Sequence, residues 1–195
     1  MKRKSTWSGL SILIVAGMLF ASCGNAITTT TQRTIRTTPV GPVVLTVTDG
    51  STVKTYSLAD LKDDNTTTGN GGEKEQDGTI VGPYPYIAVT LTDLLYPMGG
   101  ITAGQSVKFT ASDGSSRTLT YDQIINGNFN VYNSTGNQIT TATKPIICII
   151  YSKNGSPLDS STGPIELGTI STMNFITDQS MWLKMLQKID IIPAQ

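Results

Sequence analysis

The sequence contains no histidine, and this absence restricts its chemistry more than any other feature of the 195 residues. It excludes triads with an imidazole base, histidine-ligated zinc or haem, and imidazole proton shuttles. Charged residues are also scarce, at 14%, and the formal net charge is zero. Lys2, Arg3 and Lys4 belong to an N-terminal leader, so the rest of the chain is mildly acidic. Nucleic acid, which requires clustered lysine and arginine, is therefore not an expected partner.

Cysteine is nearly as rare, and the surroundings of the two cysteines differ. Cys148 lies in the apolar run 146–150, where a free thiol behaves as a small hydrophobic side chain and is expected in the core. Cys23 ends the leader. A disulfide between them is not expected, because an acylated Cys23 has no free thiol.

Residues 1–23 have the features of an export signal: a basic start and an apolar stretch that ends at Phe20 and is short for a bilayer-spanning helix. Ala21 and Ser22 before Cys23 resemble the lipobox of bacterial lipoproteins, in which this cysteine is diacylated and becomes the new N-terminus. Phe20 stands where leucine is usual. We therefore predict lipidation at Cys23 and a location in the cell envelope, anchored to the membrane and facing the periplasm or the exterior. The alternative is a plain secretory leader cleaved nearby.

The rest of the chain divides into a tether and one domain. Residues 24–42 are rich in threonine and other polar residues, which bury too little apolar surface to offset their chain entropy. The span 43–193 has the size of one ordinary domain with its own core.

Hydrophobic alternation predicts a β-hairpin over 43–56, and Ser57 with Asp60 has the spacing of a cap for a short helix. The same order returns later in the chain, with a hairpin over 107–119 that leads into a helix. A further short helix is expected after Thr90, which has capping spacing to an aspartate.

Three more segments decide the expected architecture. The segment 62–78 is so rich in polar residues and glycine that we expect a solvated loop. Pro83 and Pro85 favour an edge strand or loop for 84–89. The apolar run 146–151 is expected to be the central strand. Two hairpin-then-helix units then predict an α+β fold, a mixed β-sheet or barrel-like domain with short helices.

Four segments resemble the molybdopterin-binding domain of the sulfite oxidase family. They are 88–95 (AVTLTDLL), 107–114 (VKFTASDG), 149–158 (IIYSKNGSPL) and 163–167 (GPIEL). The resemblance spans most of 43–192 and implies the mixed α+β domain of that family.

The resemblance does not extend to the family's metal chemistry. Its members hold molybdenum through a cysteine on a loop in the first half of the domain and bind the pterin phosphate with Arg, Lys and His. This chain has no cysteine between Gly24 and Ile147, and Arg117 is its only arginine after Arg36. We therefore expect a binding or accessory module without a cofactor, with an envelope protein or small ligand as partner. The alternative is a molybdopterin-dependent oxidoreductase, or a subunit of one, with an atypical site at Arg117 and Cys148.

Aromatic residues supply the candidates for a shallow ligand groove, and the competing interpretation places them in the core or at its boundary. These candidates are Tyr84, Tyr86, Tyr96 and Trp182. No catalytic residue or metal ligand is assigned, and a non-enzymatic role is favoured. The segment 64–75 has part of the spacing of a calcium loop, but Thr66 and Thr68 replace two ligands, so a mobile acidic loop is expected there.

Overall fold

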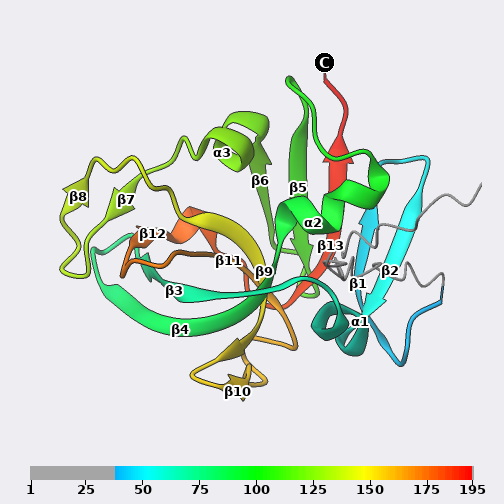
Figure 1. The fold of residues 1–195 in the computed structure, drawn as a ribbon, viewed down its shortest axis with the longest axis horizontal. Coiled ribbons are helices and arrows are strands. Elements are labelled where there is room, and N and C mark those ends of the chain that lie inside the picture. Colours follow the sequence, from blue (N-terminus) through cyan, green and yellow to red (C-terminus); the bar gives the residue numbers. More distant parts are fainter. Residues whose placement is uncertain (1–37, 195) are drawn as a thin grey trace, which may run out of the picture. The chain divides into compact units, whose positions relative to one another are not determined.

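The computed structural model describes residues 38–194, which belong to one compact unit (Figure 1). The leader, Cys23 and most of the tether lie outside the described residues, so the signal and lipidation predictions stay predictions. Within residues 38–194, no helix is long and apolar enough to cross a membrane.

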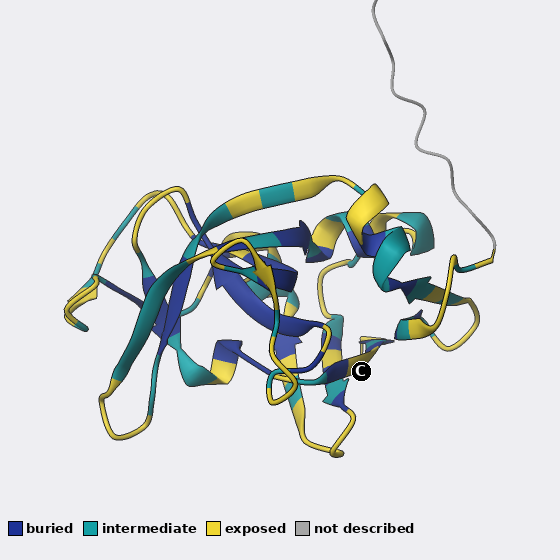
Figure 2. Cartoon of the chain, turned by 90° about the horizontal axis from the view of Figure 1, so that it is seen from below, coloured by how far each residue is buried: buried dark blue, intermediate teal, exposed yellow. Residues whose placement is uncertain are grey.

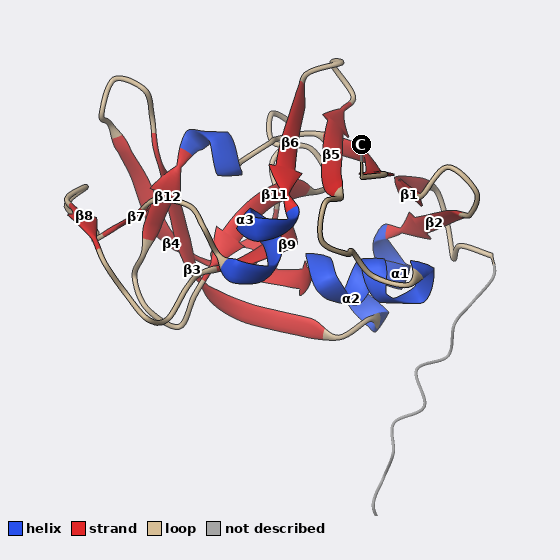
Figure 3. Cartoon of the chain, turned by 90° about the horizontal axis from the view of Figure 1, so that it is seen from above, coloured by secondary structure: helices blue, strands red, loops and turns tan. Residues whose placement is uncertain are grey.

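Strands provide most of the regular structure (Figure 3). The strands are β1 (Val43–Thr48), β2 (Val53–Ser57), β3 (Thr66–Lys74), β4 (Ile80–Thr90), β5 (Ser106–Ala111), β6 (Ser116–Thr120), β7 (Val131–Tyr132), β8 (Gln138–Ile139), β9 (Ile146–Lys153), β10 (Ser156–Pro157), β11 (Glu166–Ile170), β12 (Ile176–Asp178) and β13 (Leu186–Ile192). The helices are α1 (Leu58–Asp63), α2 (Leu91–Leu95) and α3 (Tyr121–Asn126), with 3-10 turns η1 (Tyr96–Met98) and η2 (Gln179–Met181).

The first sheet has the strand order β2-β1-β13-β5-β6. The hairpins β1–β2 and β5–β6 are the two that the sequence predicts. β13 lies between them, parallel to β1 and antiparallel to β5. The C-terminal strand therefore joins two hairpins that do not pair with each other (Figure 1).

Each hairpin leads into a capped short helix, which confirms the helix predictions. At α1, Ser57 Oγ accepts a hydrogen bond from the Asp60 amide, and the Asp60 carboxylate accepts one from the Ser57 amide at 2.8 Å. Thr120 and Gln123 form the same reciprocal pair at α3. Thr90 caps α2 after β4. Such caps satisfy amides that have no partner inside the helix.

The second sheet has the order β10-β9-β4-β3-β12-β7-β8, and β11 pairs with β9 as a branch. β9 pairs with β4, β10 and β11, which confirms the predicted central strand. Its residues from Ile147 to Ser152 are all buried. Buried residues concentrate on the strands, and the turns are exposed (Figure 2).

The α+β, barrel-like fold prediction was wrong. Within residues 38–194, strands hold 46% of the residues and helices 15%, in two mixed sheets of which neither closes into a barrel. The predicted helices exist, but each has only five or six residues. The main reason for the error is that segments predicted as loop are long strands.

The predicted solvated loop contains β3. Its glycines allow the chain at the end of β11 to pass very close: a Cβ on Gly71 would lie 2.1 Å from the Thr169 carbonyl oxygen, and one on Gly69 would lie 2.7 Å from that of Ser171. Asn70 and Ser171 exchange backbone hydrogen bonds of 2.8 and 2.9 Å. Because β3 runs through the calcium-like spacing, those residues form an extended strand instead of a calcium loop.

The edge-strand prediction for 84–89 was wrong for most of the segment. β4 pairs with β3 along its length and also with β9 from Tyr86 to Thr90. Pro83 and Pro85 lie before Tyr86, in the part of β4 that β9 does not reach, so their missing N–H groups interrupt no hydrogen bond to β9.

Candidate functional site

Two polar side chains, Tyr86 of β4 and Glu166 of β11, lie on the same face of the second sheet. Tyr86 is opposite Lys153 on β9, while Ile150 on β9 is opposite both Ala88 and Glu166. Residues directly opposite each other, and residues two apart in a strand, share a face. Tyr86 and Glu166 are therefore diagonal neighbours with β9 between their strands.

Trp182, directly after η2, packs on this face. Its ring centroid is 5.8 Å from that of Tyr86, with the planes tilted by 48°. The indole Nε1 donates to Thr177 Oγ1 at 2.9 Å, and that oxygen lies 2.9 Å from Thr169 Oγ1. Gly168 leaves room for the ring, because a Cβ there would lie 2.4 Å from Cζ3 of Trp182.

Glu73 of β3 is a second buried carboxylate near the same face. A register shift between Gly71 and Glu73 precedes it, and such bulges redirect side chains. Glu73 is 9% exposed, Glu166 4% and Tyr86 5%. Within residues 38–194, none of these three side chains forms a hydrogen bond or ion pair. The one fully enclosed side-chain polar atom without a partner in that range is Arg117 Nε, so the three side chains keep their oxygens in contact with water-sized space.

Burial and mutual repulsion shift the ionisation of this cluster. Burial raises the pKa of Glu166 to about 7; Lys153 opposes the shift and Glu73 adds to it. The pKa of Glu73 is also raised, mainly by burial and against the effect of Lys184. Burial, followed by the charges of Glu166 and Glu73, raises the pKa of the Tyr86 hydroxyl. A buried carboxylic acid that titrates near neutrality is unusual and marks a candidate functional position.

Tyr86 also lines a shallow pocket of about 290 Å³ between β3 and β4, beside the turn after β9. Its lining residues are Thr68, Gly69, Asn70, Pro85, Tyr86, Ile87 and Gly155. The volume is at the lower end for small-molecule sites. Tyr86 thus connects the pocket with the buried carboxylates.

The structure brings three of the four predicted groove residues together. Tyr86 and Trp182 are in ring contact, and Tyr84 shares the face of Tyr86 and lies under Lys153, whose Nζ is 3.9 Å from the Tyr84 ring centroid. Tyr96 lies apart on η1, beyond the end of β4, and is 77% exposed. The low exposure of Tyr86 and Trp182 is that of core residues.

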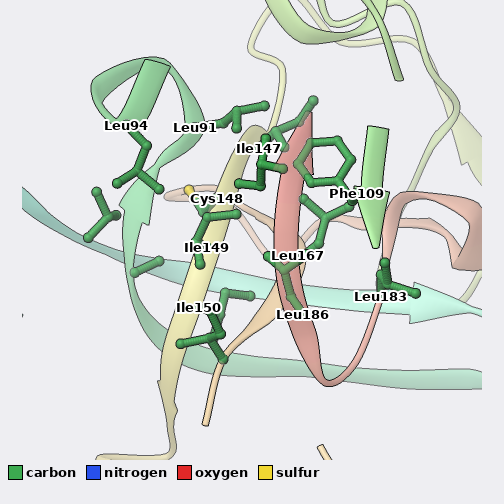
Figure 4. Close-up of a cluster of buried hydrophobic side chains, with 14 of the residues drawn as sticks. Leu91, Leu94, Phe109, Ile147, Cys148, Ile149, Ile150, Leu167, Leu183 and Leu186 are labelled. Atoms are coloured by element: carbon green, nitrogen blue, oxygen red, sulfur yellow. The ribbon is translucent and has the colours of Figure 1, made fainter. Parts of the chain in front are cut away.

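Cys148 lies in the hydrophobic core on β9 (Figure 4). It is 0% exposed, and its Sγ is 3.6 Å from the carbonyl oxygen of Ile146. Burial, with a smaller effect from Asp93, raises the pKa of this thiol to about 12. A neutral, enclosed thiol does not fit the role of a molybdenum ligand, which requires an accessible thiolate.

Arg117, the other cofactor candidate, is on β6 in the first sheet, whereas Cys148 is in the second. Its Nη1 donates to the carbonyl oxygen of Ser116 at 3.1 Å. Burial raises the pKa of Glu73, and the charge of Arg117 opposes this rise as the smallest of several contributions. Among residues 38–194, no group of three or more acidic or cysteine side chains is placed to hold a metal ion.

Sequence reasoning missed Glu73 and Glu166. Glu166 carries a weak signal, because it lies between two apolar residues, Ile165 and Leu167, which are both fully buried in the structure. Glu73 carries none, since it lies in a polar segment where an exposed position was expected.

No protein-family model matches the sequence, and a search of curated proteins found no match. The resemblance to the sulfite oxidase family therefore stays a prediction.

Proposed function

We propose that the chain is a cell-envelope lipoprotein whose β-rich domain is a binding or accessory module without redox chemistry. The leader that ends at Cys23 supports the anchor. Kinship with the molybdopterin-binding domain of the sulfite oxidase family is part of the proposal and rests on the four sequence segments alone.

The burial of Cys148 is the observation that best supports a module without redox chemistry. It is the only cysteine after Cys23, and it is buried as a neutral thiol. A molybdenum site at Cys148 would require β9, the central strand, to leave the hydrophobic core. No described residue of the domain offers another thiolate.

The binding role rests on the Tyr86 pocket. Its lining residues include the aromatic Tyr86, the apolar Pro85 and Ile87 and the polar Thr68 and Asn70. Apolar walls with a few polar groups are typical of small-ligand sites. A small ligand is thus the favoured partner, and an envelope protein is the alternative.

Metal analysis of protein purified from its native envelope tests the absence of a cofactor. We expect molybdenum far below one atom per chain. Stoichiometric molybdenum would overturn this part of the proposal, and the Cys148→Ala variant would show whether that metal depends on the thiol.

Membrane fractionation tests the anchor. The parent chain, acylated at Cys23, is expected in the membrane fraction and in the detergent phase of a detergent phase separation. The Cys23→Ser variant is expected to lose acylation and to move to the aqueous phase. The Cys148→Ser variant is the matched control and should stay with the membrane. A Cys23→Ser chain that still carries fatty acid would contradict the anchor.

A further inference from the structure

We propose that Glu73, Glu166 and Tyr86 form a proton-operated switch inside the second sheet, in which a proton on Glu166 keeps β11 paired with β9 and packed against β3. Loss of this proton places a second carboxylate charge in the largely buried region where Glu73 already acts on Glu166. The switch is a regulatory property beyond the binding role proposed above, and only its effect on the Tyr86 pocket depends on that role.

The arrangement of the three side chains carries the inference. They come from β3, β4 and β11, are at most 9% exposed, and form no side-chain hydrogen bond with another of residues 38–194. Their oxygens keep only a small contact with water-sized space. A buried carboxylate without a partner is strongly disfavoured, whereas the neutral acid is tolerated. Glu166 therefore binds a proton more tightly in this position than in water.

The surrounding charges moderate this effect but do not cancel it. Lys153 reaches in from β9 with its ammonium over the Tyr84 ring, and Lys184 lies on the exposed segment before β13. Arg117 acts from β6 on Glu73, and Asp159 acts from the loop before β11 on Glu166. Within residues 38–194, none of these cations forms an ion pair with Glu73 or Glu166.

The switch lies directly behind the pocket. Tyr86 is one of the residues that line the pocket, while its hydroxyl responds to the charges of Glu166 and Glu73. Asn70, another lining residue, is bonded through its backbone to Ser171 just after β11. A shift of β11 on loss of the proton would therefore be transmitted to two of the pocket residues.

Trp182 provides the readout, because it contacts Tyr86 and is the only tryptophan besides Trp7 in the leader. We would record the emission of the full chain carrying Trp7→Phe between pH 5 and 9. The expected result is one transition with a midpoint near pH 7. In Glu166→Gln, whose side chain mimics the neutral acid, the transition should disappear.

Neighbouring charges predict the direction in which the midpoint moves. Glu73→Gln removes a like charge and should lower the midpoint, whereas Lys153→Met removes an opposing charge and should raise it. Glu75→Gln, which changes the other glutamate of the β3–β4 hairpin, is the matched control and should keep the transition. A purely structural role for these residues predicts no such opposite shifts.

Two outcomes would overturn the switch. One is a transition that persists unchanged in Glu166→Gln. The other is a flat response between pH 5 and 9 of both the Trp182 emission and the Glu166 side-chain carboxyl signal in a carbon-13 NMR titration. A flat response would contradict the switch but not the binding role. Failure to find any ligand would contradict the binding role but not the titration of Glu166, so the two failures can be told apart.

Discussion

Trp182 lies directly over Gly168, and the benzo ring of the indole occupies the space that any larger side chain at position 168 would need. A Cβ there would come within 2.4 Å of Cζ3 and 2.6 Å of Cε3. The pair holds η2 against β11 and positions the indole beside Tyr86. One hydrogen atom in place of a methyl group thus determines how the candidate site is packed.

Gly168→Ala should destabilise the domain by about 1–3 kcal/mol, because the methyl group forces the indole from its position in a closely packed region. Urea unfolding measures this change. In a Trp182→Phe background, which removes the clashing ring atoms, the same substitution should cost clearly less. An equal cost in both backgrounds would show that the indole is not the obstacle.

Thr177→Val should destabilise the domain by about 1–3 kcal/mol, because Trp182 Nε1 loses its partner at a fully buried position. Thr169→Val removes only the hydroxyl-to-hydroxyl contact and is the matched comparison, with a smaller expected loss. Thermal or urea unfolding of both variants checks the order. The reverse order would place the important hydrogen bond elsewhere.

The free energy of unfolding should fall as the pH rises from about 4.5 to about 7. The pKa of Glu166 is raised from 4.5 to about 7, so below this window both the folded and the unfolded chain hold the proton. Inside the window only the unfolded chain releases it, and the linked loss is about 3 kcal/mol. Turn aspartates such as Asp159, with its pKa lowered to about 2, act at lower pH.

Glu166→Gln should remove most of this slope, since the amide cannot ionise. Denaturant unfolding at several pH values gives the measurement, with Glu75→Gln as a control that keeps the slope. Equal stability of the parent chain at pH 5 and pH 7.5 would show that the burial of Glu166 does not couple its ionisation to folding.

Cys148 should not react with a water-soluble thiol reagent in the folded, acylated chain, because the thiol is fully enclosed and its pKa is raised to about 12. One equivalent should react after unfolding in denaturant. Cys148→Ala supplies the background. Fast reaction under native conditions would reopen the alternative of an exposed ligand at this position.

Local signals in the sequence predicted the local structure well. The hairpins, the caps at Ser57 and Thr90, the helix after the second hairpin and the central strand β9 depend on neighbouring residues or on a continuous apolar run. Such features are determined within a few residues, so a single sequence is enough to find them.

The missed features depend on distant parts of the chain. In the sequence, Gly69 and Gly71 resemble loop residues. In the structure, the backbone at Thr169 and Ser171 comes so close that no side chain fits at either glycine. Glu73 is paired with Thr177 of β12, and β11 also contacts β3; both strands come about 100 residues later in the sequence, so its burial leaves no local signal. The candidate site therefore was not predictable from local patterns, and only the aromatic pair Tyr86 and Trp182 was named in advance.

The position of β13 determines when the first sheet can form. Its neighbours β1 and β5 come earlier in the sequence, and β13 is the strand that pairs with both. Until β13 lies between them, β1–β2 and β5–β6 are two separate hairpins with open edges. The first sheet is therefore completed only when β13 is inserted, and loss of its pairing would expose the edges of β1 and β5 together.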